Sequence, residues 1–372
     1  MPEPSIELLI FVAFALIAAI QLFYYLFFFS RLAFYKPAEK KEQYQHPISV
    51  IVCAKDEDEN LARNVPGLVF QQYPSTYEVL IVNDNSEDDT KFILQELQKE
   101  FKHIRVITLQ QPGRMIPGKK YPLSIGIREA KHELLLLTDA DCVPASEHWV
   151  QKMQAAYDEG IDIVLGYGAY IKYKGWLNRL IRFETFHTAL QYFSYALAGL
   201  PYMGVGRNLS YKRSLFLNNK GFSASNHLPG GDDDLFINKV ATSKNTAIVI
   251  DPEAHTISKP KKTWRQWRQQ KARHYSVSKY YKGKHKWLLG LYSFSHFLFY
   301  PLLIAAAILF TWWWAVGIFL LRLMVQYLVM GKAMKKLNEA DLIKWIFAMD
   351  LWMFFYYLFF SPLLLKKAKK SW

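Results

Sequence analysis

The chain has 372 residues, of which 51% are hydrophobic and 16% aromatic, and it carries a formal net charge of +14. This length supports one sizeable domain plus apolar segments, and the positive charge indicates anionic partners such as acidic lipids or phosphorylated substrates. The two cysteines, Cys53 and Cys142, give no disulfide framework and no zinc signature.

The first predicted element is a transmembrane helix. Residues 6–29 are mostly apolar and contain one charged residue, Glu7, and the run is long enough to cross a bilayer. A cleavable signal peptide is the alternative, but the run lacks a basic region before it and a small-residue cleavage site before Arg31. We therefore expect residues 1–30 to anchor the chain in a membrane.

A soluble domain is expected next, over residues 31–285. Strand-like runs alternate with helical stretches, which predicts parallel βαβ units and a doubly wound sheet. We expect one strand in each of the segments 46–61, 77–90, 102–110, 134–144 and 160–171.

The remaining residues, 286–372, form a predicted membrane region. Two spans are expected at about 287–310 and 312–331, with TWWWAVG at 311–317 as a turn at the membrane interface. A third apolar segment covers about 342–365.

Basic residues flanking the spans predict the orientation. They follow the first span and lie on both sides of the C-terminal pair, at Arg31, Lys36, Lys40, Lys41, Lys282, Lys284, Lys286, Lys332, Lys335 and Lys336. This pattern predicts an integral inner or plasma membrane protein with its N-terminus outside and its catalytic domain in the cytoplasm.

The third apolar segment does not fit a simple span. The lysines of KKAKKSW (366–372) would then lie outside, whereas Pro362 and Asp350 favour a segment that lies in the interface or dips in and returns. Charges inside a membrane usually pair or face a polar path. We therefore expect Asp350 to pair with Arg322.

Acidic side chains follow three of the predicted strands. They are Asp56 and Glu57, then Asp84, then Asp139 and Asp141. Because ligands of open α/β sheets bind at the carboxyl ends of the strands, these acids predict a common site. No GxGxxG follows the first strand, and GRMIPGKK (113–120) lacks P-loop spacing and its Ser or Thr.

Together, five motifs in order carry a resemblance to a known family. They are AKDEDEN (54–60), VNDNSEDDT (82–90), TDADC (138–142), GGDDDLF (230–236) and QQKARH (269–274). The chain resembles a membrane-anchored, inverting family 2 glycosyltransferase over about residues 46–275. The resemblance implies a GT-A fold, a doubly wound, Rossmann-like mixed α/β sheet, flanked here by N- and C-terminal transmembrane helices.

The resemblance assigns the first two motifs to the nucleotide of the donor. Ala54, Asp56 and Glu57 match the part that contacts the nucleoside, and Asp84 matches the acid that hydrogen-bonds the base or ribose. An N-cap of the following helix is the alternative for Asp84.

Asp139 and Asp141 match the DxD motif, which implies a Mg²⁺ or Mn²⁺ cofactor bound together with the donor diphosphate. Asp141 is the expected direct ligand, and Asp139 also belongs to the donor site. The alternative is a structural acid pair satisfied by lysines. Lys119 or Lys120 would help to hold the diphosphate, or else lie in a solvated loop.

In GGDDDLF, the resemblance implies that Asp232 or Asp233 removes the proton of the acceptor hydroxyl. Asp233 is favoured, although the sequence does not decide between the two. An acid cluster that stabilises a helix N-terminus is the alternative and also explains Asp234.

The motif QQKARH resembles the family's QxxRW, with His274 at the position where Trp is commonest. The resemblance implies that Gln270, Arg273 and His274 close over the diphosphate and acceptor. Residues 263–286 also resemble a basic amphipathic segment at a membrane surface.

MGVGRN resembles the segment on the acceptor side, with Gly204, Gly206 and Asn208 as the informative residues. The aromatic-rich run at 176–199 either packs on the sheet or rests on the membrane.

These residues predict a metal-dependent hexosyltransferase that moves a sugar from a UDP- or GDP-sugar to a lipid-linked or glycan acceptor in the cell envelope. Membrane lipids are expected partners, and nucleic acid is not, because the basic residues crowd the membrane flanks. The alternatives are a processive polysaccharide synthase and a non-catalytic, donor-binding membrane subunit.

Overall fold

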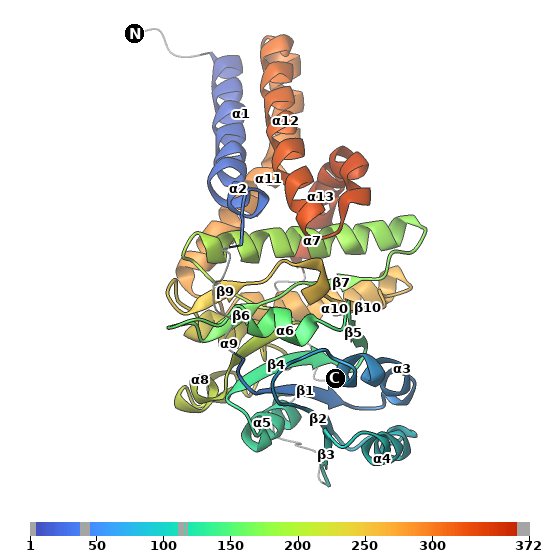
Figure 1. Cartoon of the computed structure of the whole chain (residues 1–372). Helices are drawn as coiled ribbons and strands as arrows, with labels where there is room; N and C mark the ends of the chain where they lie inside the picture. The colour runs from blue at the N-terminus through green and yellow to red at the C-terminus, as the bar shows by residue number, and fades with distance from the viewer. Residues whose placement is uncertain (1–4, 38–44, 111–115, 117, 363–372) are drawn as a thin grey trace.

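The computed structural model describes residues 5–37, 45–110, 116 and 118–362. Its central feature is a seven-stranded sheet of order β3-β2-β1-β4-β8-β6-β9 (Figure 1). The first four strands in chain order are parallel, and β8 is antiparallel to both of its neighbours. The strands are β1 Ile48–Ala54, β2 Tyr77–Asn83, β3 Ile104–Thr108, β4 Leu134–Asp139, β6 Ile163–Leu165, β8 Leu209–Lys212 and β9 Thr246–Ile248.

Helices cover both faces of this sheet, as its largely buried and mostly apolar strands require. On β1, Val50 and Val52 face one core while Ile51 faces the other. The first core includes residues of α3, α4 and α6, and the second includes residues of α5, α7 and α9. The helix bounds are α3 Asp58–Val69, α4 Thr90–Glu100, α5 Lys120–Glu129, α6 Trp149–Gln154, α7 Trp176–Leu197, α8 Arg213–Asn218 and α9 Asp234–Val240.

A second, three-stranded sheet corrects one prediction. The single strand expected at 160–171 is two strands, because β6 belongs to the large sheet and β7 (Gly168–Tyr170) pairs with β10 (Thr256–Ser258). β5 (Cys142–Pro144) completes the small sheet. The break falls at Gly166, where an added Cβ would lie 2.5 Å from the Asn208 side chain, so only glycine fits.

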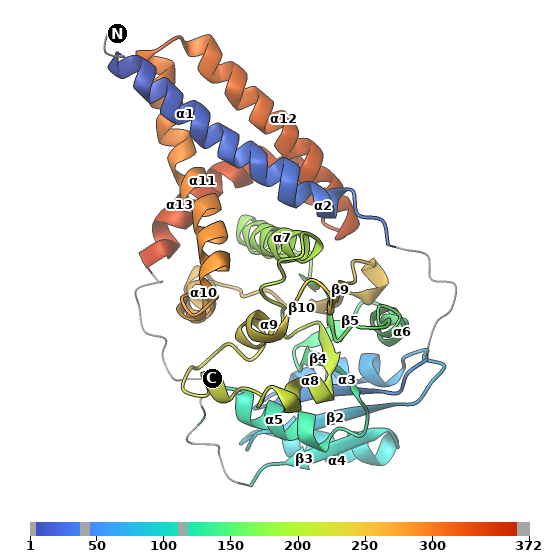
Figure 2. The same cartoon turned by 90° about the vertical axis from the view of Figure 1, so that its left-hand side faces the viewer.

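Three long helices extend away from the sheets side by side (Figures 1 and 2). They are α1 Ile6–Phe23, continued by a π-helical turn at Tyr24–Phe29 and by α2 Ser30–Ala33, then α11 Gly283–Leu309 and α12 Trp312–Lys336. All three are long and apolar enough to cross a membrane. The predicted turn at 311–317 is wrong, because α12 already begins at Trp312.

The hairpin of α11 and α12 returns the chain to the α/β domain. At the end of α12, the Lys336 ammonium donates to the carbonyl of Tyr35, and Lys172 donates to that of Asn338. Arg182 of α7 forms ion pairs with Glu339 and Asp341 in the connection that follows. The ends of both the first helix and this hairpin therefore meet the same side of the α/β domain.

The third apolar segment forms the 3₁₀-helix Ala340–Trp345 and α13 Ile346–Phe360. Figure 2 shows α13 crossing α11 obliquely near the α/β domain rather than extending beside it. By length and composition, 340–360 is a fourth candidate span, and its course in a membrane stays a prediction. The lysine-rich tail at 366–372 lies outside the described residues.

The predicted pairing of the two membrane charges is confirmed. The Arg322 guanidinium lies 2.7 Å from an Asp350 carboxylate oxygen, and both side chains are buried.

The aromatic-rich run at 176–199 packs between the sheets and the membrane helices. Its helix, α7, has no exposed residue after Trp176, and Tyr195 stacks on Phe28 at 4.6 Å between ring centroids. The packing expected for this run is thus confirmed, and its position relative to a membrane surface stays a prediction. In this structure α7 lies between the α/β domain and the long apolar helices and contacts both.

Candidate active site

The loops after β1 and β2 are tied to each other. Asp56 takes a left-handed backbone conformation with φ 54°, and its carboxylate accepts a hydrogen bond of 2.8 Å from the Glu87 N–H. In return, the Asp56 N–H donates to the Ser86 hydroxyl. Glu57 accepts a side-chain hydrogen bond from Asn60, and its N–H donates to Thr90.

Asp84 lies directly beside the end of β1. Its N–H donates to the carbonyl of Ala54 at 2.8 Å, and its side chain is buried. Burial raises the pKa of the carboxyl, and the Lys55 charge opposes that shift. The N-cap of α4 is Asp89, so the alternative that Asp84 caps this helix is wrong.

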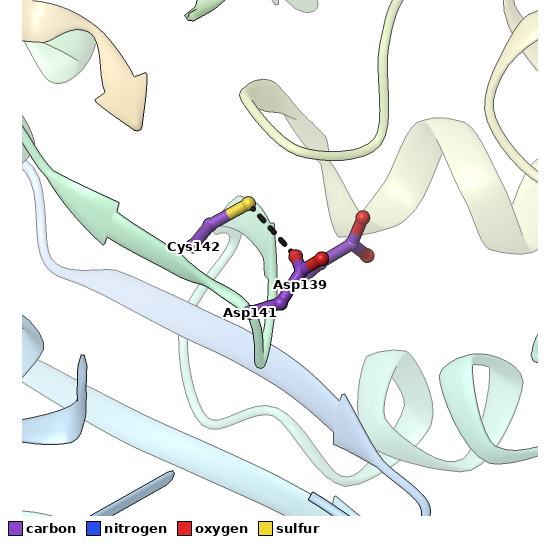
Figure 3. A group of neighbouring side chains, drawn as sticks. All are labelled: Asp139, Asp141 and Cys142. Atoms are coloured by element: carbon purple, nitrogen blue, oxygen red, sulfur yellow. Dashed lines mark hydrogen bonds between the residues drawn. The ribbon is translucent and has the colours of Figure 1, made fainter. Parts of the chain in front are cut away.

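The DxD acids lie together in the turn between β4 and β5. The Asp139 and Asp141 carboxylates and the Cys142 thiol have ligand atoms within 4.8 Å of one another (Figure 3). Burial raises the pKa of Cys142 well above its usual range, so the group is a neutral thiol that donates to Asp141. The two carboxylates are thus the hard oxygen ligands of this group, which suits Mg²⁺ or Mn²⁺.

Lys119 brings two distant motifs together. Its ammonium lies 2.7 Å from Asp139 and 3.3 Å from Asp232. These residues, with Asp233 and Gly206, line one small cavity at the end of β4. Burial disfavours the charged amine, but the surrounding carboxylates outweigh it and hold the pKa of Lys119 well above its usual range.

The neighbouring Lys120 bonds to backbone carbonyls and not to the carboxylates of the cavity. Its buried ammonium donates to the carbonyls of Ser225, Leu228 and Gly230 at 2.6–2.9 Å. Lys120 thereby holds the loop that leads into GGDDDLF. Of the two lysines considered for the diphosphate, only Lys119 lines the cavity.

The three consecutive aspartates point to different partners. The Asp233 carboxylate accepts from the N–H of Gly206 at 2.7 Å and from that of Asp234 at 2.8 Å, so it also caps α9. An added Cβ on Gly206 would lie 3.0 Å from the Lys119 ammonium, so a larger residue would crowd this site. The interpretation of the acid cluster as a helix N-terminus is therefore confirmed for Asp233, and the role of this cavity-lining carboxylate as a base stays a prediction.

Burial and the neighbouring Asp232 charge raise the pKa of Asp233. Burial and the Asp233 charge raise that of Asp234 to about 8. A carboxylate that prefers to hold a proton is a stronger base, which suits proton removal from a hydroxyl.

The motif QQKARH lies on α10 (Trp264–Ser278). The Gln270 amide donates to the Tyr170 hydroxyl at 3.2 Å. Burial acts to raise the pKa of Asp139, but the surrounding cations together outweigh burial and lower the pKa, with the largest lowering from Lys119 and a smaller one from the charge of Arg273. Arg273 and His274 are exposed. The helix therefore lies within electrostatic reach of the DxD acids.

Arg207 is a functional candidate that the sequence analysis missed. It stacks over Tyr170 at 4.4 Å and donates to Ser258 and Gly168. Its charge also helps to lower the pKa of Asp139, after the larger effect of Lys119 and against the opposing effect of burial. Its position inside MGVGRN, beside three residues already singled out, was the available signal.

Two residues expected on the acceptor side have a structural role. The Asn208 side chain is fully buried and bonds to the Trp149 indole and to the carbonyls of Tyr167 and Ala254. Gly204 is buried, where an added Cβ would lie 2.8 Å from Leu209. Both residues thus support the local backbone, and a contact of either with an acceptor stays a prediction.

The comparison with family models identifies the class. The model described as "Glycosyl transferase family 2" matches residues 49–218, and "Glycosyl transferase family group 2" matches residues 134–361. Because the second match covers more than half of the chain, this protein belongs to the family 2 group of glycosyltransferases.

Similar proteins agree with this placement. The beta-monoglucosyldiacylglycerol synthase of Trichormus variabilis is 35% identical over 101 residues, which are 27% of this chain and 21% of that protein. The probable glycosyltransferase YdaM of Bacillus subtilis is 26% identical over 292 residues, 68% of this chain and 63% of that protein. The chain thus spans less than two thirds of the length of these relatives.

A solved structure confirms the predicted GT-A fold. The mannosyltransferase PcManGT from Pyrobaculum calidifontis, in complex with GDP-Man and Mn²⁺, aligns with a TM-score of 0.58 at 18% identity. The alignment covers 94% of this chain and 99% of that one.

Proposed function

We propose that this protein is an inverting hexosyltransferase that moves a sugar from a nucleotide-diphosphate sugar to a lipid-linked or membrane-delivered acceptor. The observation that carries the proposal is the cavity in which Lys119 contacts both Asp139 and Asp232, with Asp233 alongside. Three segments far apart in the sequence thereby supply groups for a cation, a diphosphate and a hydroxyl proton at one place.

The donor would lie across the ends of β1, β2 and β4. Asp56, Glu57 and Asp84 would contact its nucleoside, and Lys119, Arg207 and Arg273, whose charges act on Asp139, would bind its diphosphate. The structural neighbour PcManGT is complexed with GDP-Man. Its name supports a nucleotide-sugar donor and leaves the base and sugar open.

A divalent cation would be held by Asp139 and Asp141. The two carboxylates fit Mg²⁺ or Mn²⁺, and the neighbour that aligns with this chain is complexed with Mn²⁺. When bound, such an ion neutralises negative charge on the departing diphosphate.

Asp233 would act as the general base. It would take the proton of the acceptor hydroxyl while that oxygen bonds to the anomeric carbon and the bond from this carbon to the diphosphate oxygen breaks. The nucleoside diphosphate leaves with the bonding electrons, and direct displacement inverts the anomeric centre. The N–H groups of Gly206 and Asp234 fix the carboxylate for this step.

An acceptor delivered by the membrane suits the architecture. Four candidate spans accompany the catalytic domain, and α10 leads from the site directly into α11. The name of one relative, a glucosyldiacylglycerol synthase, supports a lipid acceptor. The basic flanks of the helices support a cytoplasmic catalytic domain.

The direct test is a donor screen with the purified full-length protein in lipid vesicles. UDP- and GDP-sugars are supplied with Mn²⁺, Mg²⁺ or EDTA, and a membrane lipid extract serves as acceptor. We expect one donor to yield its nucleoside diphosphate and a glycolipid, with no product in EDTA or from Asp141→Asn. Long glycan chains would favour a processive synthase, and an active Asp141→Asn variant would contradict the donor site.

A further inference from the structure

The first turn of the catalytic helix α9 is bonded to the segment that opens membrane helix α11. The Tyr281 hydroxyl donates to an Asp234 carboxylate oxygen at 2.8 Å. Both side chains are nearly inaccessible, at 7% and 6% exposure. The other Asp234 oxygen accepts from the N–H of Leu235. Tyr281 therefore completes the hydrogen bonding of a buried acid.

A second contact joins the same two elements one helical turn further on. The Lys282 N–H donates to the Asn238 side-chain oxygen at 2.9 Å, and the Asn238 amide nitrogen lies 3.0 Å from the His285 ring. Asp234 and Asn238 are four residues apart, so they lie on one face of α9. Figure 2 shows α9 beneath the start of α11.

This interface lies next to the proposed base. Asp233 caps α9 and accepts the N–H of Asp234, so any rotation of the first turn moves the Asp233 carboxylate. A carboxylate that acts as base must lie within hydrogen-bond reach of the hydroxyl.

We propose that Tyr281 is a positioning residue, whose bond to Asp234 lets the membrane-anchored segment hold the Asp233 carboxylate in place for proton removal. The inference rests on the proposed function and adds a residue outside the five motifs that carry the family resemblance. Asp234 is thus a structural acid, in keeping with its raised pKa of about 8.

The test compares two adjacent tyrosines. Tyr281→Phe removes the hydroxyl but keeps the ring against Tyr202, and Tyr280→Phe is the matched control, since that side chain is 48% exposed. We expect Tyr281→Phe to lower kcat about tenfold, the effect of about 1.4 kcal/mol. The donor KM and nucleotide binding should stay within about twofold, and Tyr280→Phe should match the wild type.

A double-variant cycle distinguishes the loss of the Tyr281–Asp234 hydrogen bond from general misfolding. Asp234→Asn retains hydrogen-bonding atoms for Tyr281 and should keep most of kcat, whereas Asp234→Ala should lose as much as Tyr281→Phe. Combining Tyr281→Phe with Asp234→Ala should cost no more than the worse single change, because both remove one interaction.

Three results would overturn the inference. One is a Tyr281→Phe variant with wild-type kcat, another is additive losses in the double variant, and the third is an increase in KM that accounts for the whole defect. Wild-type protein that neither binds nor turns over any nucleotide sugar would overturn the proposed function itself, and this inference with it.

Discussion

Two clusters of buried or half-buried charges in this protein can be compared directly. In the membrane helices, the carboxylate of Asp350 accepts two hydrogen bonds from Arg322, one from Gln326 and one from Tyr300, at 2.6–3.0 Å. In the catalytic domain, Asp139, Asp141, Asp232 and Asp233 converge, and within the described part of the chain Lys119 alone forms ion pairs with them.

The difference between the clusters is charge balance. One acid faces one guanidinium in the membrane cluster, so its partners satisfy it without a ligand. The catalytic cluster has more acids than ion-pair partners, and unpaired charges near a core are costly. We infer that the first cluster stabilises the fold and that the second is built to receive a cation and a phosphorylated substrate.

The largest expected effect is on turnover in the catalytic cluster. Asp233→Asn removes the proposed base and should lower kcat by about 10²–10⁴-fold. Melting temperature should barely change, because the amide still offers an oxygen to the backbone. Nucleoside diphosphate release measures kcat, with Asp89→Asn, an acid outside the cavity, as the control. A variant within about twofold of wild type would remove Asp233 from the mechanism and leave Asp232 as the candidate.

The membrane cluster should respond in the opposite way. Removing one partner of a buried ion pair costs about 3–5 kcal/mol, because the other charge stays unpaired. We expect Asp350→Leu and Arg322→Met each to lower the yield of folded protein and its melting temperature in detergent. The double variant should recover most of the loss, and simple addition of the two losses would contradict the pairing.

The adjacent residues Lys119 and Lys120 allow the same comparison between a functional and a structural charge at neighbouring positions. Lys120→Met leaves three carbonyls unpaired and should cost about 2–3 kcal/mol of stability, with a donor KM near normal. Lys119→Met should lower kcat/KM for the donor about tenfold while the melting temperature changes less. Thermal melts and donor titrations of both variants test this, and equal effects in both measurements would contradict the division of roles.

The last prediction concerns the pH dependence of stability, where the expected change per pH unit is smaller than the losses above. Because the folded-state pKa of Asp234 is about 8, above an unfolded value near 4, the folded protein binds more protons between these values. Stability therefore falls as pH rises from about 4 to about 8, by at most about 1.4 kcal/mol per pH unit. Asp234→Asn should flatten the curve of melting temperature against pH. A slope unchanged in the variant would show that other groups titrate.

The clustering of acids at the strand ends was predictable from sheet geometry. Parallel strands end at one edge of the sheet, so Asp84 and Asp139 lie near the end of β1 although they are far apart in the sequence. The pairing of Arg322 with Asp350 was predictable for a different reason, since the membrane offers a charge few other partners.

Other features depend on packing that a linear pattern does not show. Lys119 and Lys120 are chemically alike, and only the loop at 225–230 decides which one turns inward. Asn208 was expected at the acceptor side, but its side chain is buried and bonds to one indole N–H and two backbone carbonyls. The break between β6 and β7 follows from the same Asn208 side chain, which lies against Gly166.

The central claim is that Asp139 and Asp141 hold a divalent cation for a nucleotide donor. The most direct measurement is titration of Mn²⁺ by electron paramagnetic resonance, with and without UDP or GDP, on the wild type and on Asp141→Asn. We predict one Mn²⁺ per chain whose affinity rises with one of the two nucleotides, and loss of that site in the variant. Equal Mn²⁺ and nucleotide binding by both proteins would contradict the claim.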